Sequence, residues 1–295
     1  MTAMPRRIKA QTGRNALVDG IPFRLPVNSV KTAALMTAFR IDPHRAAAML
    51  PGNELHPFRL GSHALLVVTV VNYRFTDIGR YVEFSIAIAC THGARPAPPL
   101  VPALFRRWYG TGQYVVDLPV SSEISVKGGK GIWGMPKHQA NLDFEVTDRV
   151  VSSQYDKDGM LGMRIEIDRP GGFRIPLDIG AINYCAFRGM LMKSAIYFKG
   201  HMQVGLGGGA RARMYLGNHP RVQPLKELQI DPKPVFTAYL GDVAGALDDH
   251  FEAWFLSSEG TPQPGEGLES VFDLGLSQEW LDPPKAPYGD DELVR

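Results

Sequence analysis

A single lysine, Lys137, stands where its amine could act as a nucleophile. It ends the pentapeptide Trp-Gly-Met-Pro-Lys of residues 133–137, so an indole, a thioether and a proline ring precede it closely. A lysine ammonium has an ordinary pKa of about 10.4 and keeps its proton at neutral pH, whereas apolar surroundings favour the neutral amine. A neutral amine can add to the carbonyl carbon of a ketone and form an imine. Lys137 is therefore a candidate nucleophile, with Trp133 and Met135 as candidates for its pocket; a solvated lysine side chain is the alternative.

A carboxylic acid, Glu83, could supply the proton that such a reaction needs. It lies in a predicted strand over residues 80–90, where successive side chains point to opposite faces. Glu83 shares its face with small or aromatic neighbours, which leaves it room to line a cavity; an exposed glutamate on a solvated sheet face is the alternative. The apolar face holds Val82, Phe84, Ile86 and Ile88, and the other holds Tyr81, Glu83, Ser85 and Ala87.

Several short motifs follow one another along the chain: Phe39-Arg40-Ile41-Asp42 with Leu50-Pro51, Tyr81-Val82-Glu83, Pro136-Lys137, and Tyr215-Leu216-Gly217-Asn218-His219 with Pro224-Leu225. Taken together and in this order, they resemble the acetoacetate decarboxylase superfamily over roughly residues 20–256. The resemblance implies that Lys137 is the imine-forming lysine, that Glu83 is the catalytic glutamate and that no cofactor or metal takes part. It also implies a homo-oligomer, and activation of the lysine by desolvation or by a neighbouring cation.

Three positions depart from the pattern of the family. The archetypal decarboxylases carry a second lysine after the Schiff-base lysine and an acid fifteen residues before the glutamate; this sequence has His138 and Val68 there. Because both partners are replaced, neither leaves an unpaired charge, and we expect desolvation alone to activate Lys137. The pocket arginine of the family aligns with Thr32, so Lys31, His138 and Tyr81 are the remaining candidates for polar groups in the pocket.

Strand patterns dominate the middle of the chain. We predict one hairpin from residues 64–75 and 80–90, and a second from residues 150–155 and 160–167. Residues 128–131 are expected to form a Gly-rich turn, and Asp42-Pro43 to start a short helix. A helix is also predicted after Asp242, because apolar residues recur there at every fourth position (Val243, Leu247, Phe251, Phe255). Many strands with few helices indicate a mostly β (α+β) fold, which the resemblance specifies as an antiparallel β-barrel or cone with a few peripheral helices.

The chain divides into three parts by composition. Residues 1–28 are expected to be a basic N-terminal arm, residues 29–256 a single domain, and residues 257–295 an acidic, Pro- and Gly-rich tail. The first 50 residues hold eight basic side chains and the last 55 hold thirteen acidic ones, which suggests pairing between the two ends. Relative to the family, the region around Arg95 to Tyr109 holds an insertion of about a dozen residues, which could serve as a lid or a subunit contact.

Bulk properties exclude several classes of protein. The net charge of +2 is too small to attract nucleic acid or an acidic membrane electrostatically. The longest apolar run, Ala64–Val71, is too short to span a bilayer. Two cysteines, Cys90 and Cys185, are too few for a disulfide scaffold, so a cytoplasmic location is the default. The histidines show no metal-ligand spacing, and Gly205–Gly209 is interpreted as a tight turn between strands.

The family resemblance, with these observations, implies a carbon–carbon lyase that decarboxylates a small β-keto acid through an imine on Lys137. One alternative keeps the imine but joins pyruvate to an aldehyde, as an aldolase-dehydratase does. Another alternative is a β-barrel protein without catalytic activity that binds a small carbonyl or apolar ligand.

Overall fold

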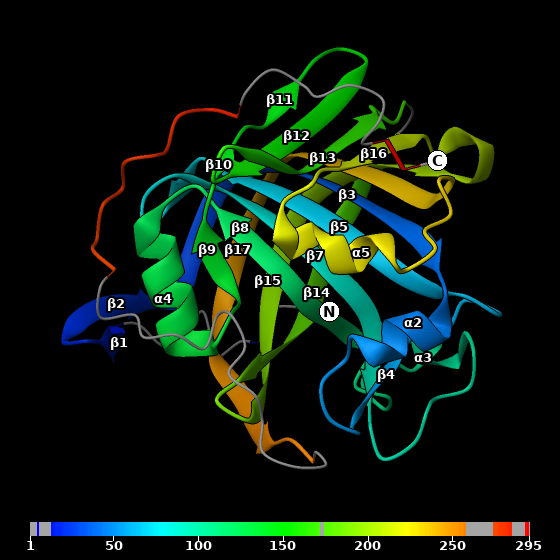
Figure 1. The fold of residues 1–295 in the computed structure, drawn as a ribbon. Coiled ribbons are helices and arrows are strands. Elements are labelled where there is room, and N and C mark those ends of the chain that lie inside the picture. The colour runs from blue at the N-terminus through cyan, green and yellow to red at the C-terminus, as the bar shows by residue number, and fades with distance from the viewer. Residues whose placement is uncertain (1–4, 6–12, 172–173, 258–273, 285–292, 295) are drawn as a thin grey trace.

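The protein is described by a computed structural model, which covers residue 5 and residues 13–171, 174–257, 274–284 and 293–294. Strands dominate the described residues, with short helices at the periphery (Figure 1). The predicted mostly β class is therefore confirmed. Among these residues, no helix is both long and apolar enough to cross a membrane.

A sheet of ten strands closes into a barrel-like ring. Strand β8 (Gly112–Val120) closes it, because it pairs in parallel with one end of an antiparallel series and antiparallel with the other end. Two parallel pairings, of β8 with β14 and with β9 (Lys137–Gln139), make the sheet mixed, where a wholly antiparallel barrel was expected. The antiparallel series runs β7 (Tyr81–His92), β5 (Ala64–Tyr73), β3 (Val27–Ile41), β17 (Pro234–Phe255), β15 (Met190–Leu206) and β14 (Ile175–Phe187). Short strands β4 (Leu55–Pro57) and β6 (Phe75–Thr76) pair with β7 and β3.

A second sheet lies over the outside of the ring (Figure 1). Its hairpin of β12 (Val150–Lys157) and β13 (Met160–Asp168) turns at Asp158 and Gly159, whose φ angles of 52° and 77° are both left-handed. Asn, Asp and Gly tolerate that conformation best, so the predicted hairpin is confirmed together with its turn chemistry. The other strands are β10 (Asn141–Leu142), β11 (Glu145–Val146) and β16 (Ala212–Leu216).

The main core fills the space between the ring and the second sheet. Phe84 of β7 meets Tyr155 of β12 edge to face, with 5.4 Å between the ring centroids. The predicted apolar face of β7 is buried in this core, so the opposite face, which carries Glu83, points into the ring. The alternation read from the sequence is therefore confirmed on both faces.

Residues 242–255 are part of strand β17, and the predicted helix is wrong. The backbone of β17 pairs with β15 on one side. On the other side it pairs with β3 as far as Leu247. A spacing of four residues is a multiple of two, so it repeats on one face of a strand as well as on one side of a helix. The regular recurrence of apolar residues could not separate the two structures.

Helices and a hairpin cover the ends of the ring. The predicted helix after Asp42 is present as α2 (Pro43–Ala48), and the Asp42 carboxylate accepts hydrogen bonds from the amides of His44 and Arg45. The remaining short elements are β1 (Arg14–Val18) and β2 (Ile21–Leu25), α3 (Val101–Leu104), α4 (Glu123–Trp133), η1 (Gly207–Gly209), η2 (Pro220–Val222) and α5 (Gln223–Lys226).

Residues from both ends of the chain hold α4 in place. The β1–β2 hairpin lies against it on one side, and its Arg14 forms an ion pair with Asp249 of β17, as the opposite charges of the two ends suggested. On another side runs the C-terminal strap, residues 274–284. Within it, Leu274 accepts a hydrogen bond from Lys127 at 2.7 Å, and Trp280 donates one to the carbonyl of Arg80 at 3.0 Å.

Candidate active site

The ring encloses a cavity of about 90 Å3. About 10–15 Å3 of such space holds one water molecule, so a small organic molecule fits. The wall is mainly apolar, and it is built from strands β3, β5, β7, β8, β14, β15 and β17, from α4, and from Phe23 of the hairpin. Among the described residues that line it, Glu83 and Lys137 are the only charged side chains.

Lys137 reaches the cavity from the first position of β9. Helix α4 ends at Gly134, whose φ of 63° turns the chain through Met135 and Pro136 into β9. The lysine side chain then runs back along the helix past Gly129. A Cβ atom on Gly129 would lie 2.5 Å from Cδ of Lys137, so only glycine leaves room for this path.

Residues 128–131, predicted to be a turn, lie within helix α4 instead. Glycine costs a helix about 1 kcal/mol per residue relative to alanine, so propensity opposes this structure. Close packing offsets that cost, because Phe23 contacts Gly128, Lys137 contacts Gly129, and Val18 contacts Gly131 at distances that a Cβ atom would forbid. The glycines therefore bring the hairpin, the helix and the lysine together.

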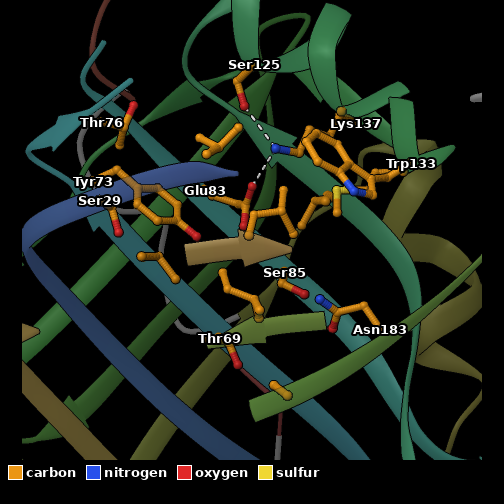
Figure 2. A pocket seen from close by; sticks show the side chains of 18 of the residues that line it. Ser29, Thr69, Tyr73, Thr76, Glu83, Ser85, Ser125, Trp133, Lys137 and Asn183 are labelled. Atoms are coloured by element: carbon orange, nitrogen blue, oxygen red, sulfur yellow. Dashed lines mark hydrogen bonds and ion pairs between the residues drawn. The ribbon is translucent and has the colours of Figure 1, made fainter. Parts of the chain in front are cut away.

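The amine of Lys137 is buried and has two polar partners. Its Nζ lies 2.7 Å from Oε2 of Glu83 and donates a hydrogen bond of 2.9 Å to Oγ of Ser125 (Figure 2). The lysine side chain is 4% exposed and that of Glu83 is 14% exposed. The ring centroid of Tyr81 lies 5.4 Å from Nζ. The structure thus brings together the predicted nucleophile and the predicted acid, but it adds a direct carboxylate contact to the expected desolvation.

Two tyrosines extend this polar group. Tyr73 of β5 and Tyr81 of β7 are register partners and stack with 4.6 Å between their centroids. Burial, with the negative charge of Glu83 added, raises the pKa of both phenols well above the ordinary value of 10. Both rings therefore stay neutral at physiological pH and can only donate or accept a hydrogen bond beside Glu83.

Trp133 and Met135 line the cavity next to Lys137, where the sequence placed them. The indole is fixed by a hydrogen bond of 3.1 Å from its Nε1 to the backbone oxygen of Asp248. The only polar atom of the indole thus has its hydrogen-bond partner outside the cavity, so the ring presents only carbon atoms toward the amine of Lys137.

His138 and Lys31 lie outside the cavity, which corrects the prediction that they line it. His138 follows Lys137 on β9, and side chains alternate along a strand, so the imidazole faces the opposite side. Lys31 stands at a left-handed position of β3, with φ of 53°, and its Nζ lies 5.6 Å from the ring centroid of exposed Phe75.

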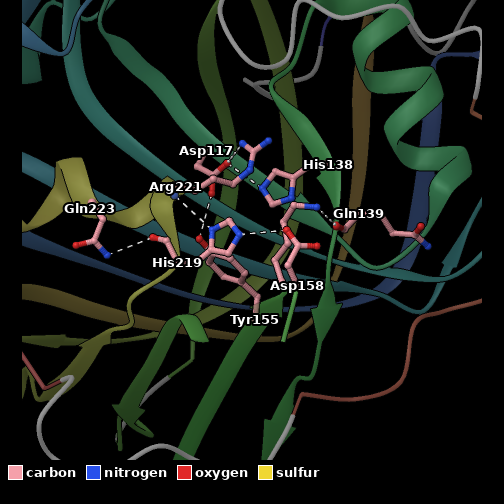
Figure 3. A network of polar contacts seen from close by, with 9 residues as sticks. Asp117, His138, Gln139, Tyr155, Asp158, His219, Arg221 and Gln223 are labelled. Carbon is pink, nitrogen blue, oxygen red and sulfur yellow. Dashed lines mark hydrogen bonds and ion pairs between the residues drawn. The ribbon is translucent and has the colours of Figure 1, made fainter. Parts of the chain in front are cut away.

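His138 belongs to a buried polar network on the outer side of β8 and β9 (Figure 3). Oδ1 of Asp117 lies 2.9 Å from Nε2 of His138 and accepts a hydrogen bond of 3.0 Å from Arg221, and Oδ2 accepts one of 3.1 Å from Tyr155. Burial alone would raise the pKa of Asp117, but His138 and Arg221 together lower it below its ordinary value. The acid that the family carries at the position of Val68 on β5 is absent here, but Asp117 of β8 gives His138 a carboxylate partner.

Several residues of these sites were not predicted from the sequence. Ser125 lay in a stretch interpreted as the approach to a turn, and Phe23 in an arm to which no chemistry was assigned. Tyr73 could have been found, because a hairpin between residues 64–75 and 80–90 sets it opposite Tyr81. Asp117 carries no signal beyond an acid within an apolar strand.

Comparison with known sequences identifies the family. The profile described as acetoacetate decarboxylase (ADC) matches residues 3–169, more than half of the chain. The chain belongs to the acetoacetate decarboxylase family. Comparison with curated protein sequences gives no significant match.

Solved structures share the fold at low sequence identity. An acetoacetate decarboxylase has a TM-score of 0.56 and 15% identity, over 79% of this chain and 91% of that one. The enduracididine biosynthesis enzyme MppR complexed with pyruvate gives 0.57 and 14%, over 80% and 92%. An acetoacetate decarboxylase-like enzyme from Sphingomonas wittichii RW1 gives 0.53 and 16%, over 78% and 94%. The family therefore includes enzymes, and its fold is that of this chain.

Proposed function

We propose that this protein is a carbon–carbon lyase that decarboxylates a β-keto acid through an imine on Lys137. The observation that carries the proposal is the position of the Lys137 amine, buried in the wall of an apolar cavity and 2.7 Å from a carboxylate. The family supports it, since its members include acetoacetate decarboxylases.

The first step needs a neutral amine beside an acid. Transfer of one proton from the Lys137 ammonium to the Glu83 carboxylate, across the 2.7 Å between Nζ and Oε2, produces both at once. The amine then attacks the ketone carbon, the nitrogen passes a proton to the ketone oxygen, and Glu83 protonates the resulting hydroxyl so that it leaves as water. The product is an iminium ion on Lys137 and an ionised Glu83.

The iminium ion then acts as the electron sink. The bond to the carboxyl group breaks, its electron pair moves into the iminium, and carbon dioxide and an enamine form. Glu83 takes a proton from solvent and delivers it to the enamine carbon. Addition of water, with Glu83 accepting a proton, releases the ketone and restores the starting pair. The net reaction consumes one proton and produces one ketone and one carbon dioxide.

Aldol addition and dehydration from pyruvate would use the same imine. In that reaction the carboxylate stays in the product and needs a lasting cationic partner. Lys137 is the single cation among the described lining residues, and the imine consumes it. Decarboxylation removes the carboxylate, so the composition of the wall favours decarboxylation.

Trapping with borohydride tests the proposal. Incubation with acetoacetate followed by reduction should add a stable alkyl group to Lys137, located by peptide mapping, and release of carbon dioxide should separate decarboxylation from carbon–carbon bond formation. Lys127 is the matched control, because it is equally buried on α4 but pairs with Asp19 at 2.9 Å outside the cavity. Lys137→Gln should abolish the label and Lys127→Gln should not. Absence of any adduct at Lys137 would favour a binding protein without catalysis.

A further inference from the structure

We propose that the keto acid carries a hydrocarbon chain longer than the methyl group of acetoacetate, so that the product is a longer methyl ketone. This inference rests on the proposed imine chemistry and names its substrate class. It is drawn from the composition and the register of the cavity wall.

Two rows of apolar side chains cross the strands that form this wall. In the first row, Ala181 of β14 pairs with Ile196 of β15, Ile196 pairs with Leu247 of β17, and Leu247 pairs with Val27 of β3. All four line the cavity. Because register partners on neighbouring strands lie side by side, the row is a continuous hydrocarbon surface across four strands.

The second row lies two residues along the same strands. Ile179 pairs with Phe198, and Phe198 pairs with Gly245. A Cβ atom on Gly245 would lie 2.8 Å from Oγ of Ser29 and 3.1 Å from the phenyl ring, so only glycine lets the ring lie close against β17. Ile179 and Phe198 both line the cavity, so its wall offers two rows of apolar side chains, a larger hydrocarbon surface than a methyl group covers.

The polar groups away from Lys137 are all neutral. Gln113 donates a hydrogen bond of 2.8 Å to Asn183, and in Figure 2 Asn183 lies beyond Glu83 from Lys137, together with Ser85 and Thr69. A neutral amide pair can hydrogen-bond to an uncharged group, but it cannot compensate a carboxylate removed from water. The substrate thus has its one charge next to Lys137, where that charge leaves as carbon dioxide, and an uncharged chain elsewhere.

The reaction for this class balances as for acetoacetate. The bond between the carboxyl carbon and the α-carbon breaks, a proton replaces the carboxyl group, and the chain on the ketone carbon is unchanged. One 3-oxo acid anion and one proton yield one methyl ketone and one carbon dioxide.

A series of ketones tests chain length without depending on turnover. Acetone, hexan-2-one and octan-2-one are each trapped on the enzyme with cyanoborohydride, and the rate of labelling at Lys137 is measured. Burial of each methylene is worth about fourfold in affinity, so octan-2-one should label at least about tenfold faster than acetone at equal low concentration. Equal labelling by the three ketones, or faster labelling by acetone, overturns the inference but leaves the imine intact. No label with any probe refutes the proposed function itself.

Substitutions in the first row link the preference to the cavity. Ala181→Phe should lower the octan-2-one to acetone ratio at least about tenfold, and Ile196→Ala should shift the optimum toward longer chains. Ala244→Phe, the same change at an exposed position of β17, is the control and should leave the ratio unchanged. If Ala181→Phe does not fold, Ile196→Ala still decides; an unchanged ratio in the folded row variants overturns the inference.

Discussion

At the scale of single residues, Nζ of Lys137 and Oε2 of Glu83 lie 2.7 Å apart, in direct contact. In the proposed mechanism one proton passes between them, because the amine of Lys137 must lose a proton and the carboxyl group of Glu83 must gain one. Removing either leaves the other buried and unpaired, which is more costly than exchanging both. Conservative replacements therefore report on chemistry better than truncations do.

Glu83→Gln keeps the shape of the side chain and an acceptor for the lysine, but it can neither take nor deliver a proton. We expect imine trapping at Lys137 to persist, while turnover falls by about 10²–10⁴-fold, the usual worth of a general acid. Steady-state carbon dioxide release and borohydride labelling, measured on the same preparation, separate the two effects.

The matched control is Glu166→Gln. Glu166 has the same exposed fraction as Glu83, 14%, and it pairs with Arg164 at 2.7 Å in the second sheet, away from the cavity. This control should lower stability and leave turnover per folded molecule near the wild-type value. Similar turnover losses in both variants would remove Glu83 from the mechanism.

The sequence predicted the half of the site that follows from strand periodicity. Glu83 and Tyr81 face the cavity because an apolar face opposite them must enter the core. Ser125 and Asp117 could not be predicted, since each depends on which elements meet in space: α4 with β9, and β8 with η2. His138 is a different case: it stands one residue beyond Lys137 on β9, so alternation along the strand places its side chain on the other face.

At the scale of elements, helix α4 makes room for the Lys137 side chain because its glycines have no Cβ atom. Ser125 projects from it toward the amine, and Gly129 lets the lysine pass. Helix propensity and function are opposed here, because alanine would make a better helix by about 1 kcal/mol per position.

Gly129→Ala separates these two effects. The added methyl group would meet Cδ and Cε of Lys137 at 2.5 and 2.8 Å, so the amine should move and labelling at Lys137 should fall at least about tenfold, in spite of the gain in propensity. Gly131→Ala is the comparison, because its methyl group meets Val18 of the hairpin instead. Rates of labelling and melting temperatures of both variants check the prediction; equal labelling by the two would contradict it.

Strand β17 shows where element prediction reached its limit. Its residues 243–255 satisfied a helical spacing that a strand satisfies equally well, and the decisive fact was the presence of β3 and β15 on either side. Hairpins whose partners are adjacent in sequence, such as β12 with β13, were predicted correctly, because local turn chemistry specifies them.

At the scale of the whole molecule, stability depends on a buried carboxyl group that connects two parts of the second sheet. Asp143 lies between β10 and β11, and its Oδ1 accepts a hydrogen bond of 2.7 Å from the amide of Gln154 on β12. Burial raises the pKa of this carboxyl to about 6 from the ordinary value of 3.8. The folded protein therefore holds a proton there that the unfolded chain has already lost above about pH 4.

Asp143→Asn keeps the acceptor and removes the titration. Because the folded-state pKa is raised, its favourable contribution is complete below about pH 4 and is lost as the pH rises through about 6. We expect the asparagine variant to gain about 2 kcal/mol in free energy of unfolding relative to wild type between pH 4 and pH 7. Urea denaturation at both pH values checks this; a gain independent of pH would contradict it.

The C-terminal strap also determines how the protein can be shortened. A polypeptide ended after Ser257 would retain every strand of the ring, yet the outer side of α4 would lose Leu274, Ser277 and Trp280, which now lie along it. Such a fragment should still be expressed and collapse, but Ser125 would sit on a helix that frays. Protein engineers who trim this chain by its composition alone would thus discard part of the scaffold that aligns the amine of Lys137.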